Sequence, residues 1–213
     1  MSRELAKVAR RRQLIEATID GIARTGFAEL KIADVAAAAG LSVGIVNFYF
    51  KSKDALLIAT LKHLVEDYGQ AMQATLARAG KSAAAQIDAM IEADFARAQA
   101  SRKQVTVWYA FWGETRWRPE FLKLCADLST SFQHSTMASF QALIVEGGYQ
   151  GLDAGLIARG FNAMIDGLWL DMLLNPEQTD RETAKASVRA FLTGLFPKEF
   201  GGKITAANGN AAA

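Results

Sequence analysis

Cysteine is almost absent from this chain of 213 residues, which contains Cys125 alone. A single thiol cannot form an internal disulfide, and it cannot supply a zinc site built from several cysteines. The neighbouring residues are largely apolar and include Phe121, Leu122, Leu124 and Leu128. Free cysteines in such surroundings behave as small hydrophobic side chains, so we expect a buried and inert thiol. A nucleophilic or redox-sensing cysteine is the alternative.

Long apolar runs are also lacking. The sequence contains no stretch of about 18 uncharged apolar residues, the length that a bilayer-spanning helix requires. The N-terminal segment MSRELAKVARRR is basic, and no apolar signal core follows it. Hydrophobic residues nevertheless make up 51% of the chain, which is enough to bury a sizeable core. We therefore expect a globular protein that stays in the cytoplasm and has no membrane partner.

Motifs of common enzymes and metal sites are missing as well. The sequence contains no HExxH motif, no CxxC motif and no phosphate-binding loop that ends in GK[ST]. The glycines of EGGYQG are best explained as a connection between helices, because no strand pattern precedes them. His63 and His134 fall in separate predicted helices without obvious partners. We expect no catalysis, no cofactor and no bound metal.

Net charge is small, but it is divided unevenly along the chain. Residues 1–60 contain nine Lys or Arg against six Asp or Glu, a net charge of +3. The remaining residues contain fifteen Lys or Arg against sixteen acids, a net charge of −1. Basic residues that neutralise phosphates release counterions, so a basic end is typical of a domain that binds DNA. For residues 10–12 a solvated charge run is the alternative.

The region between Leu30 and Leu57 contains the pattern of two short helices joined by a tight turn. In the first helix, apolar residues recur at helical spacing at Ile32, Val35, Ala36 and Ala39. Gly40 can adopt the left-handed conformation that ends a helix, and Ser42 can cap a second helix over residues 43–49. Two residues of the second helix are expected to face inward, namely Val46 and Phe50. Four are expected to face outward, namely Val43, Gly44, Asn47 and Tyr49. The pattern predicts a helix-turn-helix, whose second helix enters a DNA major groove.

Within this region, AGLSVGIVNFYFKSKDALL resembles the helix-turn-helix of the TetR family of bacterial repressors. The resemblance implies a recognition helix over 42–48 and a long fourth helix that opens at Lys53. Two residues depart from the family pattern: Asn47 stands at a usual phosphate-contacting Tyr, and Ala33 stands near a usual Thr cap. The expected partner is double-stranded DNA. The predicted DNA-binding residues are Arg10, Ser42, Val43, Gly44, Asn47, Tyr49 and Lys53.

The periodicity of the whole chain is helical. Helices are predicted over approximately 7–25, from 52 onward, over 83–100, from 119 onward, over 152–174 and over 180–195. We expect an all-α fold of about nine helices, with a three-helix DNA-binding head over 1–52. Residues 53–200 are expected to form a helical body for ligand binding and dimerisation. Residues 201–213 lack a pattern, and we expect a disordered tail there.

Aromatic residues are concentrated in the predicted body, where VTVWYAFWGETRW contains three of the four tryptophans. The segments AFWGE, PEFLKLCADLSTSF and IDGLWLDMLL resemble the BetI-type members of the TetR family, the choline-responsive repressors of glycine betaine synthesis. The resemblance implies a homodimer that binds a palindromic operator, is released by choline and controls glycine betaine synthesis or choline uptake. A TetR-type repressor that responds to a hydrophobic drug or a fatty acyl ligand is the alternative. A non-specific architectural DNA binder would give no reason for the aromatic body.

A quaternary ammonium donates no N–H hydrogen bond, so proteins hold it with aromatic faces and a nearby carboxylate. Trp108 and Trp112 are four residues apart on one helical face, and Trp169 follows Asp166 by three residues. The predicted ligand-binding residues are Trp108, Phe111, Trp112, Glu114, Trp117, Asp166 and Trp169. Asp171 is a further anionic candidate. An aromatic-rich core, with Asp166 paired to an Arg or capping a backbone group, is the alternative.

The predicted helix over 152–174 has features of a dimer interface. A seam of limited bulk runs along it at spacings of four, three and four through Gly160, Met164, Gly167 and Asp171. A second helix could approach such a seam closely. An apolar stripe lies beside it, made of Phe161, Ile165, Leu168 and Met172. Because a helix-turn-helix commonly works as a two-fold pair, we expect homodimerisation here, with a fully buried core helix as the alternative.

Overall fold

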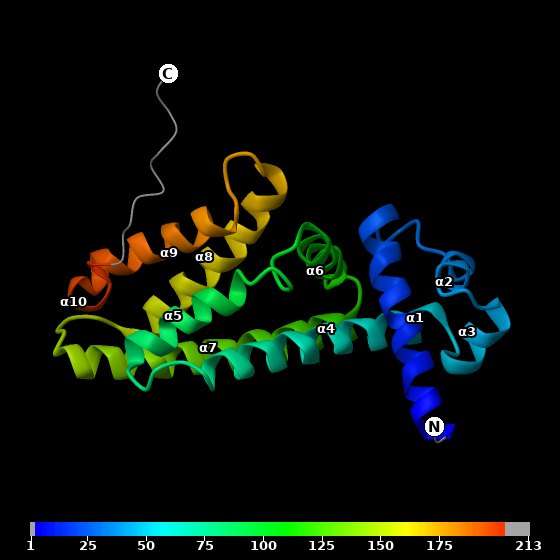
Figure 1. Ribbon diagram of the computed structural model, residues 1–213, viewed down its shortest axis with the longest axis horizontal. Helices are drawn as coiled ribbons and strands as arrows, with labels where there is room; N and C mark the ends of the chain where they lie inside the picture. The colour runs from blue at the N-terminus through cyan, green and yellow to red at the C-terminus, as the bar shows by residue number, and fades with distance from the viewer. Residues whose placement is uncertain (1–2, 203–213) are drawn as a thin grey trace. The chain divides into compact units, whose positions relative to one another are not determined.

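The computed structural model describes residues 3–202, and the regular structure in this range is entirely helical. Figure 1 shows its ten helices: α1 (Arg3–Thr25), α2 (Ile32–Ala38), α3 (Val43–Tyr49), α4 (Lys53–Leu76), α5 (Ala83–Asp94), α6 (Arg102–Glu114), α7 (Pro119–Gly147), α8 (Ala154–Leu174), α9 (Arg181–Leu195) and α10 (Pro197–Phe200). The predicted all-α class is confirmed. From residue 203 on, the predicted tail lies outside the described residues.

Two helix boundaries differ from the sequence prediction. The helix expected over 83–100 ends at Asp94, because the amides of Ala96 and Gln99 bond to carbonyls three residues back and continue the chain as tight turns. The count exceeds the expected nine because Pro197 begins the short α10 directly after α9. Proline suits a first helical turn, since the N–H it lacks has no partner there.

The described residues divide into two compact units. The N-terminal unit contains the residues up to Tyr68 together with Thr106–Leu128, and the C-terminal unit contains Gly69–Val105 and the residues from Ser129 on. Most of α6 and the beginning of α7 therefore belong to the same compact unit as the predicted DNA-binding head. The functional boundary at residue 52 stays a prediction.

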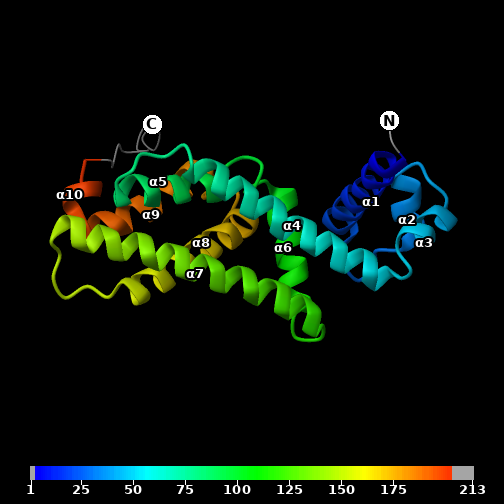
Figure 2. The same cartoon turned by 90° about the horizontal axis from the view of Figure 1, so that it is seen from below.

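The N-terminal unit holds the predicted three-helix head. In it, α1 contacts α2 and α2 contacts α3 (Figure 2). The buried core of the head includes Leu14, Ile15, Ile19, Ile22, Leu30, Val35, Ala36, Val46 and Phe50. Gln13 Nε2 donates a 2.7 Å hydrogen bond to the carbonyl oxygen of Ala39, just after α2. Because carbonyls at a helix end lack partners within the helix, this bond helps α1 to fix the position where α2 ends.

An aromatic corner joins the α1–α2 turn to α6 and α7 within the N-terminal unit. We define the Phe27 corner as Phe27, Phe111, Phe121 and Arg118. The Phe27 ring lies 5.5 Å from Phe111 and 6.0 Å from Phe121 in edge-to-face geometry. Arg118 lies over the Phe27 ring at 5.4 Å and binds Asp54 at 2.6 Å. The hydrogen bond to Asp54 is the largest influence on the Arg118 pKa and raises it. The corner thus also ties in the first turn of α4.

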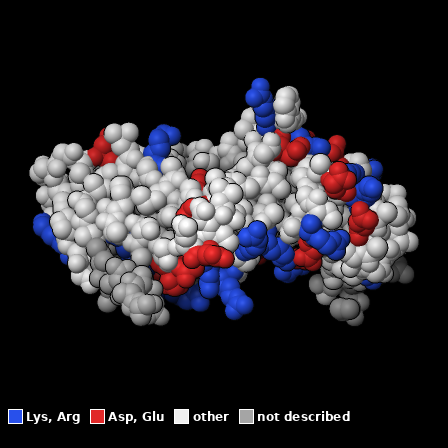
Figure 3. Space-filling view, turned by 90° about the horizontal axis from the view of Figure 1, so that it is seen from above, with Lys and Arg blue, Asp and Glu red and all other residues white. Residues whose placement is uncertain are grey.

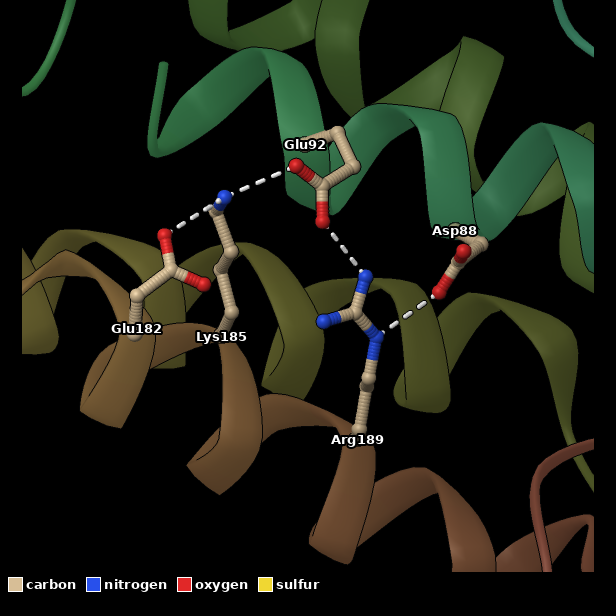
Figure 4. A network of polar contacts seen from close by, with 5 residues as sticks. All are labelled: Asp88, Glu92, Glu182, Lys185 and Arg189. Carbon is tan, nitrogen blue, oxygen red and sulfur yellow. Dashed lines mark hydrogen bonds and ion pairs between the residues drawn. The ribbon is translucent and has the colours of Figure 1, made fainter. Parts of the chain in front are cut away.

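In the C-terminal unit, α9 contacts α5, α8 and α10. Figure 4 shows the ion pairs that join α9 to α5, formed by Asp88, Glu92, Glu182, Lys185 and Arg189. Lys185 Nζ lies 2.8 Å from Glu92, and Arg189 lies 2.6 Å from the other oxygen of the same carboxylate. Burial raises the pKa of Glu92, but the two cations outweigh it and lower that pKa overall. The network therefore holds α9 against α5 with compensated charges.

Candidate functional site

The turn between α2 and α3 has the geometry that the sequence predicted. Gly40 adopts φ +62°, in the left-handed region that only glycine enters without strain. The amide of Leu41 bonds to the carbonyl of Ala36 at 2.8 Å, and the amide of Gly40 bonds to the carbonyl of Ala37 at 3.0 Å. This pair of bonds satisfies the carbonyls at the end of α2 and turns the chain toward α3.

Ser42 caps α3, as predicted, because its side-chain oxygen accepts a 3.4 Å hydrogen bond from the amide of Ile45. Residues 40–44, GLSVG, also fit the GxSxG pattern of hydrolases. That pattern requires a strand before the serine and a helix after it. Here α2 precedes Ser42, so the motif is a helix cap and not a nucleophile elbow.

On α3, Val46 is buried and the following Phe50 is also buried, so both inward predictions are confirmed. Val43, Gly44 and Asn47 are exposed, whereas Tyr49 is half-buried and its carbonyl accepts a 3.4 Å hydrogen bond from Arg11. Phe48 was not predicted to face outward, yet its exposed fraction of 77% is the largest among the exposed large hydrophobic residues. Its position two residues after the inward Val46 was the signal that could have revealed it.

The predicted phosphate-binding residues surround this helix in different ways. Arg10 is exposed and donates to Gln13 Oε1 at 2.7 Å, while Lys53 is half-buried in the first turn of α4. Two further lysines, Lys31 and Lys51, are exposed next to α2 and α3 in the sequence. Figure 3 shows basic and acidic side chains next to one another on the face it draws, not one continuous basic field. The phosphate-binding roles of Arg10 and Lys53 stay predictions.

The ligand prediction for Trp108 and Trp112 falls on an aromatic cluster inside the N-terminal unit. We define the Trp108 cluster as Tyr68, Trp108, Tyr109 and Trp112. Trp108 has an exposed fraction of 2%, and its ring lies 6.1 Å from Tyr68 and 6.0 Å from Trp112. Tyr109 stands edge-on to Trp112 at 4.9 Å. The Trp108 indole N–H is buried, and none of the described residues accepts a hydrogen bond from it.

Three other predicted ligand residues of the N-terminal unit have different surroundings. Phe111 is buried in the Phe27 corner. The Glu114 carboxylate is ion-paired with Arg118 at 3.2 Å, so its charge is already compensated. Trp117 is 72% exposed, and the guanidinium of Arg116 lies over its ring at 5.2 Å. Their roles in ligand binding stay predictions.

Asp166 and Trp169 belong to the C-terminal unit. The Trp169 ring is buried, and its indole N–H donates a 3.2 Å hydrogen bond to the carbonyl of Asp94. Asp166 is exposed on α8, yet desolvation by the surrounding protein raises the pKa of its carboxyl to about 6. Asp171 accepts hydrogen bonds from Thr179 and Asn175, which lower its pKa and anchor the α8–α9 turn. For Asp166 and Trp169, ligand binding stays a prediction.

One side of α8 forms an exposed stripe that differs in detail from the predicted seam. We define the α8 stripe as Leu156, Gly160, Ala163, Gly167, Leu170 and Leu174, all of which are exposed. The α8 stripe contains both glycines of the predicted seam, Gly160 and Gly167. The other two seam residues, Met164 and Asp171, are half-buried and lie outside the stripe. A Cβ added at Gly160 or Gly167 would meet nothing within 4 Å. The stripe lies opposite the buried side of α8, since about 100° separates successive residues of a helix.

Other candidate features of the described residues are limited. No group of three or more His, Cys, Asp or Glu in this part of the chain could hold a metal ion. Burial raises the pKa of the half-buried Cys125 to about 11, which keeps the thiol protonated. Within residues 3–202 no single helix has the length and hydropathy to span a membrane, although α2 and α3 meet that test as a pair bent by 103°.

The sequence matches two protein families. Residues 14–60 match the family described as bacterial regulatory proteins, tetR family. Residues 83–197 match the family described as BetI-type transcriptional repressor, C-terminal. The first match covers the helix-turn-helix, and the second covers more than half of the chain.

Individual proteins agree with the family matches. The chain is 35% identical to the HTH-type transcriptional regulator BetI 2 of Chromohalobacter salexigens, over 88% of each chain. It is 31% identical to the regulator BetI of Escherichia coli O157:H7, over 89% of this chain and 95% of that one.

Solved structures share the fold. A transcriptional regulator of Pseudomonas aeruginosa PAO1 superimposes with a TM-score of 0.78 at 26% identity, over 93% of each chain. A regulator of Saccharomonospora viridis in complex with choline superimposes with a TM-score of 0.78 at 22% identity, over 85% of this chain and 94% of that one. By sequence and by fold, the chain belongs to the TetR family of bacterial transcriptional regulators, within its BetI-type repressors.

Proposed function

We propose that this repressor acts in the cytoplasm as a homodimer that binds a palindromic operator and leaves it when choline or a similar quaternary ammonium binds. The genes it controls are those of glycine betaine synthesis or choline uptake. The observation that carries the ligand assignment is the Trp108 cluster. Family membership, the capped α3 and the α8 stripe support the other parts of the proposal.

The DNA-binding part rests on the arrangement of α2 and α3. Burial of Val46 and Phe50 fixes α3 to the head, so Val43, Gly44 and Asn47 are left exposed on a rigid helix. A recognition helix contacts base edges with its exposed residues, while neighbouring cations bind phosphates and set the register. Exposed Arg10 and the basic balance of residues 1–60 supply such cations.

The homodimer part rests on α8 and α9. The α8 stripe presents leucines separated by glycine and alanine, which leave room for a second helix. On the adjoining α9, Ser187, Ala190 and Gly194 are exposed as well, and all three are small. A two-fold pair of chains would cover both surfaces and place two recognition helices on two half-sites.

The ligand part rests on the chemistry of the Trp108 cluster. The aromatic rings of the cluster lie next to one another, with neighbouring centroids 4.9–6.1 Å apart, so more than one ring could border a single cation. A cation interacts with an aromatic face when it lies within about 6 Å of the ring centroid. The unpaired indole N–H of Trp108 is a donor for an oxygen of the ligand, such as the hydroxyl of choline or the aldehyde of betaine aldehyde. The choline-bound regulator of Saccharomonospora viridis is consistent with this assignment.

Contacts inside the N-terminal unit offer a route from the ligand to the DNA-binding head. Trp108 and Trp112 lie on α6, which also carries Phe111 of the Phe27 corner. The corner contacts the turn after α1 through Phe27 and the first turn of α4 through Arg118 and Asp54. A ligand that prefers a different position of α6 shifts both contacts, and operator affinity falls by the difference in binding free energy, typically about 1–3 kcal/mol.

A titration tests the proposal. The operator is first selected from a pool of random duplexes, and its affinity is then measured by fluorescence anisotropy with increasing choline, betaine aldehyde or tetramethylammonium. We expect choline to weaken operator binding by roughly 5-fold to 150-fold. Trp112→Leu should raise the choline concentration for half-maximal release about tenfold, because it removes an aromatic face. Trp117→Leu tests how far the site extends. A site limited to the Trp108 cluster predicts no change in the choline concentration for half-maximal release, whereas the wider set of residues predicted from the sequence predicts an increase.

Two outcomes would count against parts of the proposal. Release by a flat aromatic cation or a fatty acyl compound, with no response to choline, would remove the choline assignment and leave the repressor function intact. A selected pool without two-fold symmetry, bound by one chain per duplex, would contradict the palindromic operator and the homodimer.

A further inference from the structure

The exposed face of α3 carries no charge. The residues of α3 are VGIVNFY, so neither Lys nor Arg occurs between Ser42 and Phe50. Phe48 is 77% exposed, Val43 is 42% exposed and Ile45 is 39% exposed. Large apolar side chains are seldom left in water without a partner when they lie together on one short helix.

The geometry of α3 places Phe48 at the centre of this face. Successive residues are about 100° apart around a helix, so Gly44 and Phe48 both lie nearly opposite the buried Val46. Gly44 has no side chain, and a Cβ there would meet only Ser42 Oγ, at 3.7 Å. Phe48 therefore projects beside an open position, and Asn47 lies on its flank.

Base-edge chemistry then decides what this face can recognise. In the major groove, guanine is read mainly by Arg or Lys, adenine is read by Asn or Gln, and the thymine methyl is contacted by apolar side chains. The α3 face contains no guanine reader, one adenine reader in Asn47 and an apolar pair formed by Phe48 and Ile45, which lie about 60° apart around the helix.

We propose that α3 reads adenine–thymine pairs in each half-site, with Phe48 against thymine methyl groups and Asn47 on an adenine edge. This inference rests on the proposed operator binding and specifies its sequence class. The exposed lysines Lys31 and Lys51 lie outside α3, where they are suited to phosphates, which carry no sequence information directly. Affinity and sequence preference are thus assigned to different residues.

Modified bases test the proposal with the full-length protein. Duplexes are selected from a random pool, and each thymine of the selected half-site is then replaced by uracil, which lacks only the methyl group. We expect A·T-rich half-sites and a loss of affinity of about fourfold at each contacted thymine, the equivalent of one buried methyl group. Replacing the contacted adenine by 7-deazaadenine removes the N7 acceptor and should weaken binding about tenfold.

Variants assign these effects to residues. Phe48→Ala should bind the thymine and uracil duplexes equally, and Asn47→Ala should bind the adenine and 7-deazaadenine duplexes equally. Since Phe48 is exposed, its truncation leaves the core of the head intact, which circular dichroism can verify. Val145→Ala removes a 70% exposed apolar side chain of α7 and should keep the full uracil effect.

The outcomes separate this inference from the proposed function. Selection of specific half-sites rich in G·C, or a uracil effect that persists in Phe48→Ala, would overturn the assignment of α3 while the repressor function stands. Equal binding to all duplexes with a steep dependence on salt would overturn both, because it is the behaviour of a non-specific DNA binder.

Discussion

Both α3 and α8 expose apolar surface, and the two surfaces are built in different ways. On α3 the bulk stands at the centre, where Phe48 projects beside Gly44. On α8 the centre is low, because Gly160, Ala163 and Gly167 separate the exposed leucines. A protruding side chain can enter a DNA groove, whereas small residues let two helices approach closely. We therefore propose a base pair as the partner of α3 and a second copy of the chain as the partner of α8.

Glycine has a different consequence on each surface. Gly44 leaves room for the backbone of α3 to approach a flat partner, while Gly160 and Gly167 leave room for the side chains of another helix. Their backbones are not in the left-handed region, so other residues can replace them without strain. Substitutions at these positions therefore test the partner of each surface and not the fold.

The largest effect is expected from a charge on the α8 stripe. Gly167→Arg meets no atom of its own chain within 4 Å, so the monomer should fold. In a homodimer that covers the stripe, the guanidinium would be buried without a partner, at a cost of about 3–5 kcal/mol. We expect dissociation to the monomer in sedimentation experiments and a loss of operator affinity of more than 100-fold.

The exposed Gln141 on α7 supplies a control for that substitution. Gln141→Arg adds the same charge outside the α8 stripe and should remain dimeric. A Gly167→Arg protein that stays dimeric at the same concentration would place the interface elsewhere and remove the contrast between the two helices.

A smaller effect is expected on α3, with opposite signs for stability and for binding. Gly44→Ala adds a methyl group that contacts only Ser42 Oγ at 3.7 Å. Alanine favours a helix over glycine by roughly 0.5–1 kcal/mol, so the melting temperature should rise. The same methyl group would separate α3 from the bases, and we expect operator affinity to fall about tenfold. A variant that is more stable and binds DNA as tightly as the parent would show that α3 does not approach its partner closely at Gly44.

The local structure around α3 could be predicted from the sequence because short-range rules define it. Gly40 supplies the left-handed residue, Ser42 supplies the cap, and the spacing of Val46 and Phe50 decides which side faces inward. Each rule involves residues only a few positions apart. Phe48 was not predicted, although the same local rule turns it to the side of α3 opposite the inward Val46.

The surroundings of the predicted ligand residues could be predicted less well, because helical spacing reports which residues share a face but not what that face contacts. Trp108 and Trp112 do lie in one cluster. Glu114, by contrast, is paired with Arg118, a residue that also binds Asp54 from a distant part of the chain. Trp117 follows the end of α6 and is exposed. The Glu114–Arg118 pair has the local spacing of four residues, whereas the Arg118–Asp54 pair depends on tertiary structure.

The smallest effect concerns Asp166, whose carboxylate lies beside the α8 stripe. The exposed face of α3 has no such charge. The pKa of Asp166 is raised by desolvation from 3.8 to about 6, so the folded protein holds this proton more tightly than the unfolded chain does. Stability should therefore fall as the pH rises from about 4 to 6, and the penalty is fully present at pH 7. Since Asp166 is exposed, solvent screening limits the penalty to on the order of 1 kcal/mol. Asp166→Asn should raise the melting temperature at pH 7.5 by roughly 2–4 °C and leave it unchanged at pH 4.

Glu92 provides the matched control, because its pKa is lowered and its charge stabilises the folded protein above the unfolded pKa. Glu92→Gln should therefore lower the melting temperature at pH 7.5, opposite in sign to Asp166→Asn, and the loss should shrink as the pH falls through the lowered folded pKa. An equal gain for Asp166→Asn at pH 4 and pH 7.5 would show that the carboxylate charge is not its cause. In that case the charge of Asp166, beside the α8 stripe, would have no effect on the free energy of unfolding.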